Sequence, residues 1–275
     1  MRKIVLLVGT ACLISSPALA QQPDRGKPAP NDGWEVSIGG GAIYTPQYLG
    51  DDDYALNLVP SIRVNYEDKF FASVEGGVGY SLINSEIFRA GPLAQIVFGR
   101  DEDGGGPFRI SGDDSADLIG LGDVDTGVEL GGFAELDLGN VTSSLKVGKA
   151  ISAHEGFVAE LGISYKGTLQ FNGPPLIYSI GPRLNFGDAD YSNTYFGVTQ
   201  AQALASGLPE YEAEGGITSY GLSGTAIMPL TDSAAMTFIA SYTRLIGDVA
   251  DAPLVQQRGS EDQAFAGAIF SYAFN

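Results

Sequence analysis

The nine residues from Phe157 to Tyr165 read FVAELGISY, and their alternation decides the fold. Phe157, Leu161 and Tyr165 fall on one side of the segment, and Glu160 and Ser164 fall on the other. A period of two is typical of a β-strand, because successive side chains of a strand point to opposite faces. This segment therefore predicts a strand with one large apolar face and one face of small and charged residues.

The same alternation recurs along the chain in segments of about ten residues or more, separated by turns or acidic loops. A tilted strand of about 9–11 residues crosses a bilayer, whereas strands of soluble proteins are nearer ~5–6 residues. The pattern therefore favours an antiparallel transmembrane β-barrel over the alternative, a soluble secreted β-sandwich. The expected strands are about 34–44, 54–66, 69–80, 87–99, 126–138, 141–150, 156–167, 175–187, 216–228, 234–246 and 263–274.

Charged residues on the small-residue faces support the barrel. A sandwich core would have to bury or expel them, because an unpaired charge is costly in an apolar interior. Both signs occur, so we expect them to pair across the lumen of a barrel. The candidate lumen charges are Arg63, Glu75, Arg89, Glu129, Lys146, Glu160 and Arg183.

The number of expected strands, eleven, is odd, whereas bacterial single-chain barrels have an even number. With both termini in the periplasm, counting back from Phe274 places the loops 101–124, 188–215 and 247–262 outside. Counting forward from Trp34 conflicts with this assignment before residue 126. The sequence therefore predicts about twelve strands, with ten as the alternative. The missing or miscounted strand is expected in the N-terminal third.

The N-terminus has the features of a secretory signal peptide. Arg2 and Lys3 precede a short apolar stretch, and a small-x-small site ends at Ala20. The only cysteine, Cys12, lies inside this segment, so no disulfide is expected after cleavage. The expected division is a signal peptide at 1–20, a flexible periplasmic lead-in at 21–33 and an outer-membrane barrel at 34–275.

The formal net charge of −18 argues against binding to nucleic acid. Much of the acidity lies in loops, as in Asp51–Asp53 and Asp101–Asp103, and solvated loop charge is the simplest interpretation. Calcium binding, with bridging to lipopolysaccharide, is a second hypothesis, although no EF-hand spacing is present. We expect no dedicated metal site and no cofactor.

The only histidine, His154, lies at an expected tight connection between strands. A lipid- or peptide-hydrolysing barrel would need it beside a serine or carboxylates. The sequence contains neither a G-x-S-x-G nor an H-x-x-x-H motif. We therefore expect a turn histidine bonded locally, no catalytic residue and no enzyme, with a hydrolase through His154 as the remaining alternative.

One long outer loop contains a short helix-prone segment, Thr199–Ala205. Thr199 is a suitable N-cap and Gly207 a suitable C-cap. Such a helix either folds over the mouth of the barrel or presents a surface to a partner.

An ordered set of short segments resembles the MipA/OmpV family of outer-membrane proteins and covers nearly all of the chain after the signal peptide. They are Gly99–Asp103, Gly120–Asp125, Gly127–Gly131, His154–Gly156, Asn193–Thr199, Ser206–Pro209, Arg244–Asp248 and Asp251–Pro253.

The resemblance implies an outer-membrane barrel without catalytic residues. In the best-known branch it implies a scaffold that joins a lytic transglycosylase to a bifunctional penicillin-binding protein during murein growth. Other members are described as adhesins or antigens. We therefore expect a non-enzymatic scaffold surrounded by outer-membrane lipid and lipopolysaccharide, with a narrow pore or uptake channel and a surface adhesin as alternatives.

Overall fold

The computed structural model describes residues 33–102, 108–112 and 115–274. The expected signal peptide and almost all of the lead-in lie outside the described residues. The strands are β1 Trp34–Pro46, β2 Tyr54–Tyr66, β3 Phe70–Ser73, β4 Gly77–Tyr80, β5 Ile83–Asn84, β6 Phe88–Val97, β7 Arg109–Ser111, β8 Gly127–Asp137, β9 Val141–Ala150, β10 Phe157–Leu169, β11 Leu176–Gly187, β12 Gly216–Pro229, β13 Ala234–Leu245 and β14 Asp262–Phe274. The helices are α1 Ala189–Phe196, α2 Gln200–Ser206, α3 Asp248–Asp251 and α4 Pro253–Arg258.

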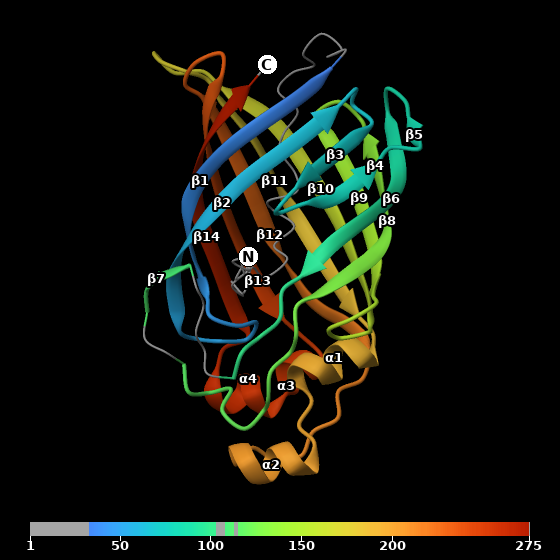
Figure 1. The fold of residues 1–275 in the computed structure, drawn as a ribbon, viewed down its shortest axis with the longest axis vertical. Helices are drawn as coiled ribbons and strands as arrows, with labels where there is room; N and C mark the ends of the chain where they lie inside the picture. Colours follow the sequence, from blue (N-terminus) through green and yellow to red (C-terminus); the bar gives the residue numbers. More distant parts are fainter. Residues whose placement is uncertain (1–32, 103–107, 113–114, 275) are drawn as a thin grey trace, which may run out of the picture.

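The strands close into an antiparallel barrel (Figure 1). Neighbours along the chain pair in the order β1-β2-β3-β4-β6-β8-β9-β10-β11-β12-β13-β14, and β14 pairs back with β1. This path has twelve strands, so the expected fold class and strand count are confirmed. The short strands β5 and β7 lie off this circuit and pair with β6 and β2.

The missing strand lies in the N-terminal third, as the strand count indicated. The expectation of one strand at 69–80 was wrong, because the segment is a hairpin of β3 and β4. Its turn is stabilised by the Ser73 hydroxyl, which accepts a hydrogen bond from the Gly76 N–H at 2.8 Å. Gly77 has a φ of 77°, which a glycine adopts without strain. The hairpin restores the alternation of strand directions.

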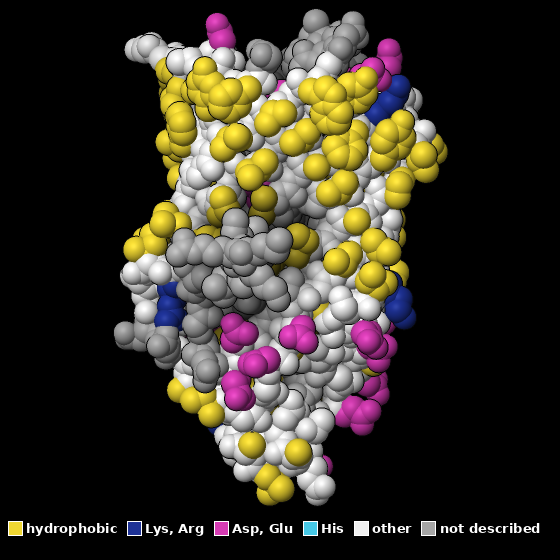
Figure 2. Space-filling view, viewed as in Figure 1, with side chains coloured by type: hydrophobic (Ala, Val, Ile, Leu, Met, Phe, Trp, Pro, Cys, Tyr) yellow, Lys and Arg dark blue, Asp and Glu magenta, His cyan; other side chains and the backbone are white. Residues whose placement is uncertain are grey.

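The outer surface has the two aromatic girdles of a membrane barrel. At the end where Gly33 and Phe274 lie, here called the terminal end, Trp34 packs on Tyr66 with ring centroids 4.7 Å apart. Ten residues further along β1, Tyr44 stacks on Tyr54 at 5.1 Å. Ten residues of a strand tilted by ~40° rise roughly 25 Å, the height of a hydrocarbon layer. Figure 2 shows apolar side chains over the strands and acidic ones mainly toward the opposite end.

That opposite end, here called the helical end, carries all four helices of the described residues (Figure 1). Two apolar clusters pack its loops together, and we refer to them as the cap. One cluster is Tyr48, Leu118, Leu121, Val198, Leu208 and Leu254, and the other is Phe196, Leu245, Val249, Ala250, Ala252 and Val255.

The expected short helix is present as α2. The Thr199 hydroxyl accepts a hydrogen bond from the Gln202 N–H, and the Gln202 side chain accepts one from the Thr199 N–H, which together form a capping box. Gly207 follows with a φ of 79°, as expected for a left-handed C-cap. Within the described residues, no helix is both long and apolar enough to cross a membrane.

Candidate functional site in the barrel lumen

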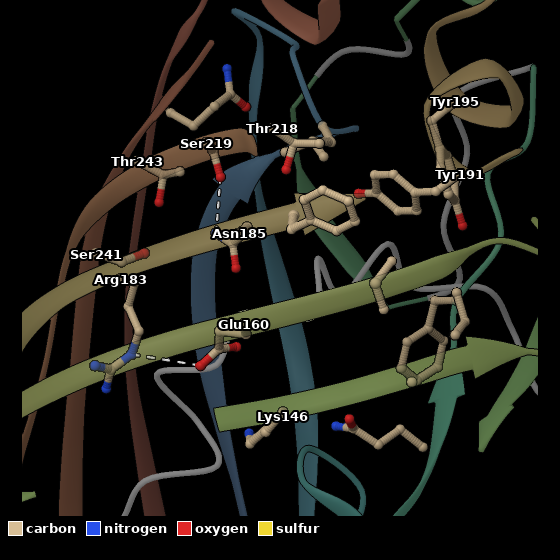
Figure 3. Close-up of a pocket in the computed structure, with 18 of the residues that line it drawn as sticks. Lys146, Glu160, Arg183, Asn185, Tyr191, Tyr195, Thr218, Ser219, Ser241 and Thr243 are labelled. Carbon is tan, nitrogen blue, oxygen red and sulfur yellow. Dashed lines mark hydrogen bonds and ion pairs between the residues drawn. The ribbon is translucent and has the colours of Figure 1, made fainter. Parts of the chain in front are cut away.

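A cavity of about 220 Å³ lies in the lumen beside the cap. Strands on opposite sides of the barrel contribute to it, with Gln95 on β6 and Thr243 on β13 among its lining residues. Tyr191 and Tyr195 of α1 also line it (Figure 3), and so does Leu245 of the cap. The lining mixes both charge signs with hydroxyl and amide groups.

The central ion pair of the cavity joins β10 to β11. Glu160 Oε1 lies 3.7 Å from Arg183 Nε, and both side chains are largely buried. Arg183 also donates to the Ser164 hydroxyl at 3.1 Å and to the Pro182 carbonyl at 3.0 Å. A Cβ at Gly162 would overlap the Arg183 guanidinium, so this glycine provides the space in which the side chain lies. Figure 3 shows the pair side by side.

Five of the seven predicted lumen charges line this cavity: Glu75, Glu129, Lys146, Glu160 and Arg183. Lys146 is the register partner of Glu160 on the adjacent strand. Arg89 lies elsewhere, with its Nη2 3.4 Å from Glu135 Oε2. Arg63 lies on β2, opposite Ser37 and Ser73, and is not part of the cavity lining. The cavity therefore brings together five of the seven candidates, and Arg63 and Arg89 do not line it.

The sequence-based selection omitted the neutral polar side of the cavity. Asn185 donates to the Ser219 hydroxyl at 2.9 Å, and both residues line the cavity (Figure 3). Ser241, Thr243 and Gln263 extend this polar surface across the next strands. The sequence contained a signal for Asn185, because the period-two alternation places it on the same strand face as Arg183.

His154 lies between β9 and β10 and lines the cavity beside α1. Its side chain is buried, and its Nδ1 accepts a hydrogen bond from the Gly156 N–H at 3.0 Å. The ring packs edge-on against Tyr191 with centroids 5.1 Å apart. Burial lowers the pKa of His154 and raises the pKa of Tyr191 to about 12, so both rings are neutral near pH 7. These contacts are those of the locally bonded turn histidine expected from the sequence.

Comparison with known proteins agrees with this architecture. The sequence model described as "MltA-interacting protein MipA" matches residues 38–274. The chain belongs to the MipA family. The outer membrane protein OmpV of Vibrio cholerae serotype O1 is 29% identical over 279 residues, covering 100% of both chains. The outer membrane protein Omp26La of Vibrio anguillarum is similarly 29% identical over 279 residues, also with 100% coverage.

The putative outer membrane protein YiaT of Escherichia coli K12 is 24% identical over 231 residues, which cover 82% of this chain and 87% of YiaT. Among solved structures, an outer membrane channel from Pseudomonas putida F1 aligns with a TM-score of 0.46 at 9% identity, covering 92% of this chain and 100% of the channel. The closed barrel, the family match and the relatives described as outer membrane proteins identify this MipA-family protein as an outer-membrane β-barrel, as the sequence predicted.

Proposed function

We propose that this MipA-family barrel is a non-enzymatic scaffold that binds a murein-cleaving lytic transglycosylase, and through it a penicillin-binding protein. The description of the family as MltA-interacting supports a partner of this class. The observation that carries the proposal is the cap, which fills the helical end with buried side chains such as Phe196 and Leu254. A barrel built in this way offers fixed surfaces rather than a wide aqueous channel.

The terminal end, which we expect to face the periplasm, carries the best candidate contact for such a partner. The connection around β5 exposes Leu82 at 72% and also Ile83 and Ile87. Leu82 lies two residues after Tyr80, the aromatic residue at which β4 ends. Exposed apolar residues of this kind commonly mark protein interfaces.

The test is a pull-down from detergent extracts using the full chain. We expect a lytic transglycosylase to be enriched, with loss of that enrichment in Leu82→Asp/Ile87→Asp. The matched control is Leu204→Asp, because Leu204 on α2 is 85% exposed at the opposite end. The scaffold proposal fails if no transglycosylase is enriched at matched expression, and the location fails if only Leu204→Asp abolishes binding.

The proposal of a non-enzymatic role is supported by the contacts of His154, whose Nδ1 is already bonded to a main-chain amide. We expect purified protein to show no hydrolysis of phospholipid or peptide substrates beyond a heat-denatured sample. Hydrolysis that disappears in His154→Ala would instead support the barrel hydrolase.

A narrow uptake channel is the second candidate, and a specific feature of the wall favours it. Among the described residues, pairing of β2 with β3 ends at Arg63 and Ser73, and pairing of β4 with β6 ends at Val78 and Ala94. Ile96, which is half exposed, lines the cavity together with its inward neighbour Gln95, so the cavity reaches this interruption. Planar-bilayer recording tests it, since a channel gives discrete conductance steps and a closed scaffold gives none.

A further inference from the structure

We propose that Asp51, Asp52 and Asp117 form a calcium site at the helical end of the barrel. Each offers a carboxylate oxygen, and these oxygens lie within 4.8 Å of one another. Two oxygens on opposite sides of a calcium ion, each at about 2.4 Å, are separated by roughly this distance. The inference is independent of the scaffold function.

Asp51 supplies the observation that points to a ligand. Its side chain is 0% exposed, although it lies in a loop. One carboxylate oxygen, Oδ1, accepts a hydrogen bond from the Asp53 N–H at 3.0 Å. The other, Oδ2, is buried and has no hydrogen-bond partner within the described part of the chain. An uncompensated buried carboxylate is costly, and a bound cation would compensate it.

The backbone holds Asp51 in this position. Asp51 forms an antiparallel bridge with Gly259, and its carbonyl accepts a hydrogen bond from the Gln263 side chain at 3.1 Å. The carboxylate is therefore fixed before any ion binds, which reduces the ordering cost of binding. Burial and the neighbouring carboxylates of Asp117, Asp53 and Asp52 raise the pKa of Asp51 to about 7.

Arg258, a cationic residue at the end of α4, contacts main-chain carbonyls near this cluster. Arg258 donates to the Asp117 carbonyl at 2.6 Å and to the Ser206 carbonyl, rather than to a carboxylate. No ion pair between described residues includes Asp51, Asp52 or Asp117. Asp117 Oδ2 accepts one hydrogen bond, from the Ser115 hydroxyl at 3.1 Å.

The ligand chemistry favours calcium over other divalent ions. Carboxylate oxygens suit hard cations, and calcium accepts 6–8 of them in flexible geometry, whereas magnesium requires a near-ideal octahedron. Asp52 is exposed and Asp117 is partly exposed, so water completes the coordination from the solvent side. Extracellular calcium modules bind at ~0.1–1 mM, and we expect an affinity in this range.

An ion at this site would connect separate loops of the cap. Asp51 and Asp52 lie in the β1–β2 loop, and Asp117 lies between β7 and β8. The bridge from Asp51 to Gly259 adds the segment after α4. Calcium would therefore stabilise the cap rather than the strands.

Isothermal titration of the refolded full-length barrel with calcium chloride tests the site. We expect one saturable event near 0.1–1 mM, at least tenfold weaker in Asp51→Asn/Asp117→Asn. The matched control is Asp232→Asn, which removes one carboxylate from an exposed turn at the terminal end and should leave binding unchanged. Absence of binding by the wild-type protein, or equal binding by the folded double variant, would overturn the proposal.

Terbium luminescence tests the location without depending on the folding of the double variant. Tyr48 lies in the same β1–β2 loop, and its carbonyl accepts a hydrogen bond from the Asp51 N–H at 3.1 Å. We expect terbium emission excited through tyrosine, displaced by calcium, and reduced at least twofold in Tyr48→Phe. Emission that calcium does not displace, or that Tyr48→Phe leaves unchanged, counts against this site.

Discussion

The ion pair between Glu160 and Arg183 allows a quantitative test of how the lumen is held together. The two side chains are 14% and 6% exposed, and the charged atoms are 3.7 Å apart. At an effective dielectric constant of about 20, their attraction is about 4.5 kcal/mol. Removing one partner of a buried pair costs about 3–5 kcal/mol, because the other charge is left uncompensated. Glu160→Gln should therefore destabilise the barrel strongly.

The two single variants should differ. In Glu160→Gln, Arg183 keeps its hydrogen bonds to Ser164 and Pro182 but loses its counter-charge, so we expect a loss of about 3 kcal/mol. In Arg183→Gln, Glu160 still faces Lys146 across the strand pair, so the loss should be about 1–2 kcal/mol. The double variant leaves neither charge uncompensated and should cost about 1–2 kcal/mol, which gives a coupling energy near 3 kcal/mol.

Denaturant unfolding in lipid vesicles measures these differences. Trp34, the only tryptophan, reports on the process from the aromatic girdle at the terminal end. Asp262→Asn is the matched control, because the Arg244–Asp262 pair is solvent-exposed and should matter far less. If the single losses simply add within about 0.5 kcal/mol, the buried pair does not interact as described.

Three further variants test the packing of the lumen and of the cap. Gly162→Ala should lower the free energy of unfolding by about 1–3 kcal/mol, because its Cβ would displace the Arg183 guanidinium. The control Gly216→Ala should be neutral in the same assay, because its Cβ would meet no atom within 4 Å. His154 has a lowered pKa in the folded state, so the unfolded state binds a proton first as the pH falls. The free energy of unfolding should therefore decrease below about pH 6.5. Thermal unfolding measured from about pH 8 to about pH 5 should lose this component in His154→Gln. Leu254→Ala should cost about 2–5 kcal/mol at a fully buried position and increase proteolysis at the helical end, with Leu204→Ala unchanged.

The alternation of side chains was sufficient to predict the barrel, because residues such as Leu161 and Ser164 face outward and inward as their spacing requires. It failed at β3 and β4 because each has only 4 residues. The alternation continues through their turn, so periodicity alone cannot show where one strand ends and the next begins. The glycines at 76 and 77 were the available signal for this turn.

The candidate site could be predicted only in part for a different reason. Alternation determines the face of a residue, but its height in the lumen depends on the stagger between strands. Arg63 and Arg183 thus share a face but not a site. Asp51 shows that sequence alone does not reveal long-range contacts in a loop either. The simplest interpretation of its loop was solvated charge, but its side chain is buried. Its carbonyl accepts a hydrogen bond from Gln263, 212 positions along the chain.

The cap and the cavity share residues, and this separates the two candidate functions. Leu245 belongs to an apolar cluster of the cap and also lines the cavity, and Tyr195 packs on that cluster while lining the same cavity. Loosening the cap by Leu254→Ala should therefore change access to the lumen. If the protein is a channel, its conductance should rise in that variant. If it is a scaffold that binds its partner at the terminal end, conductance should stay at background and partner capture should be unchanged, because Leu82 and Ile87 lie at the opposite end of the barrel.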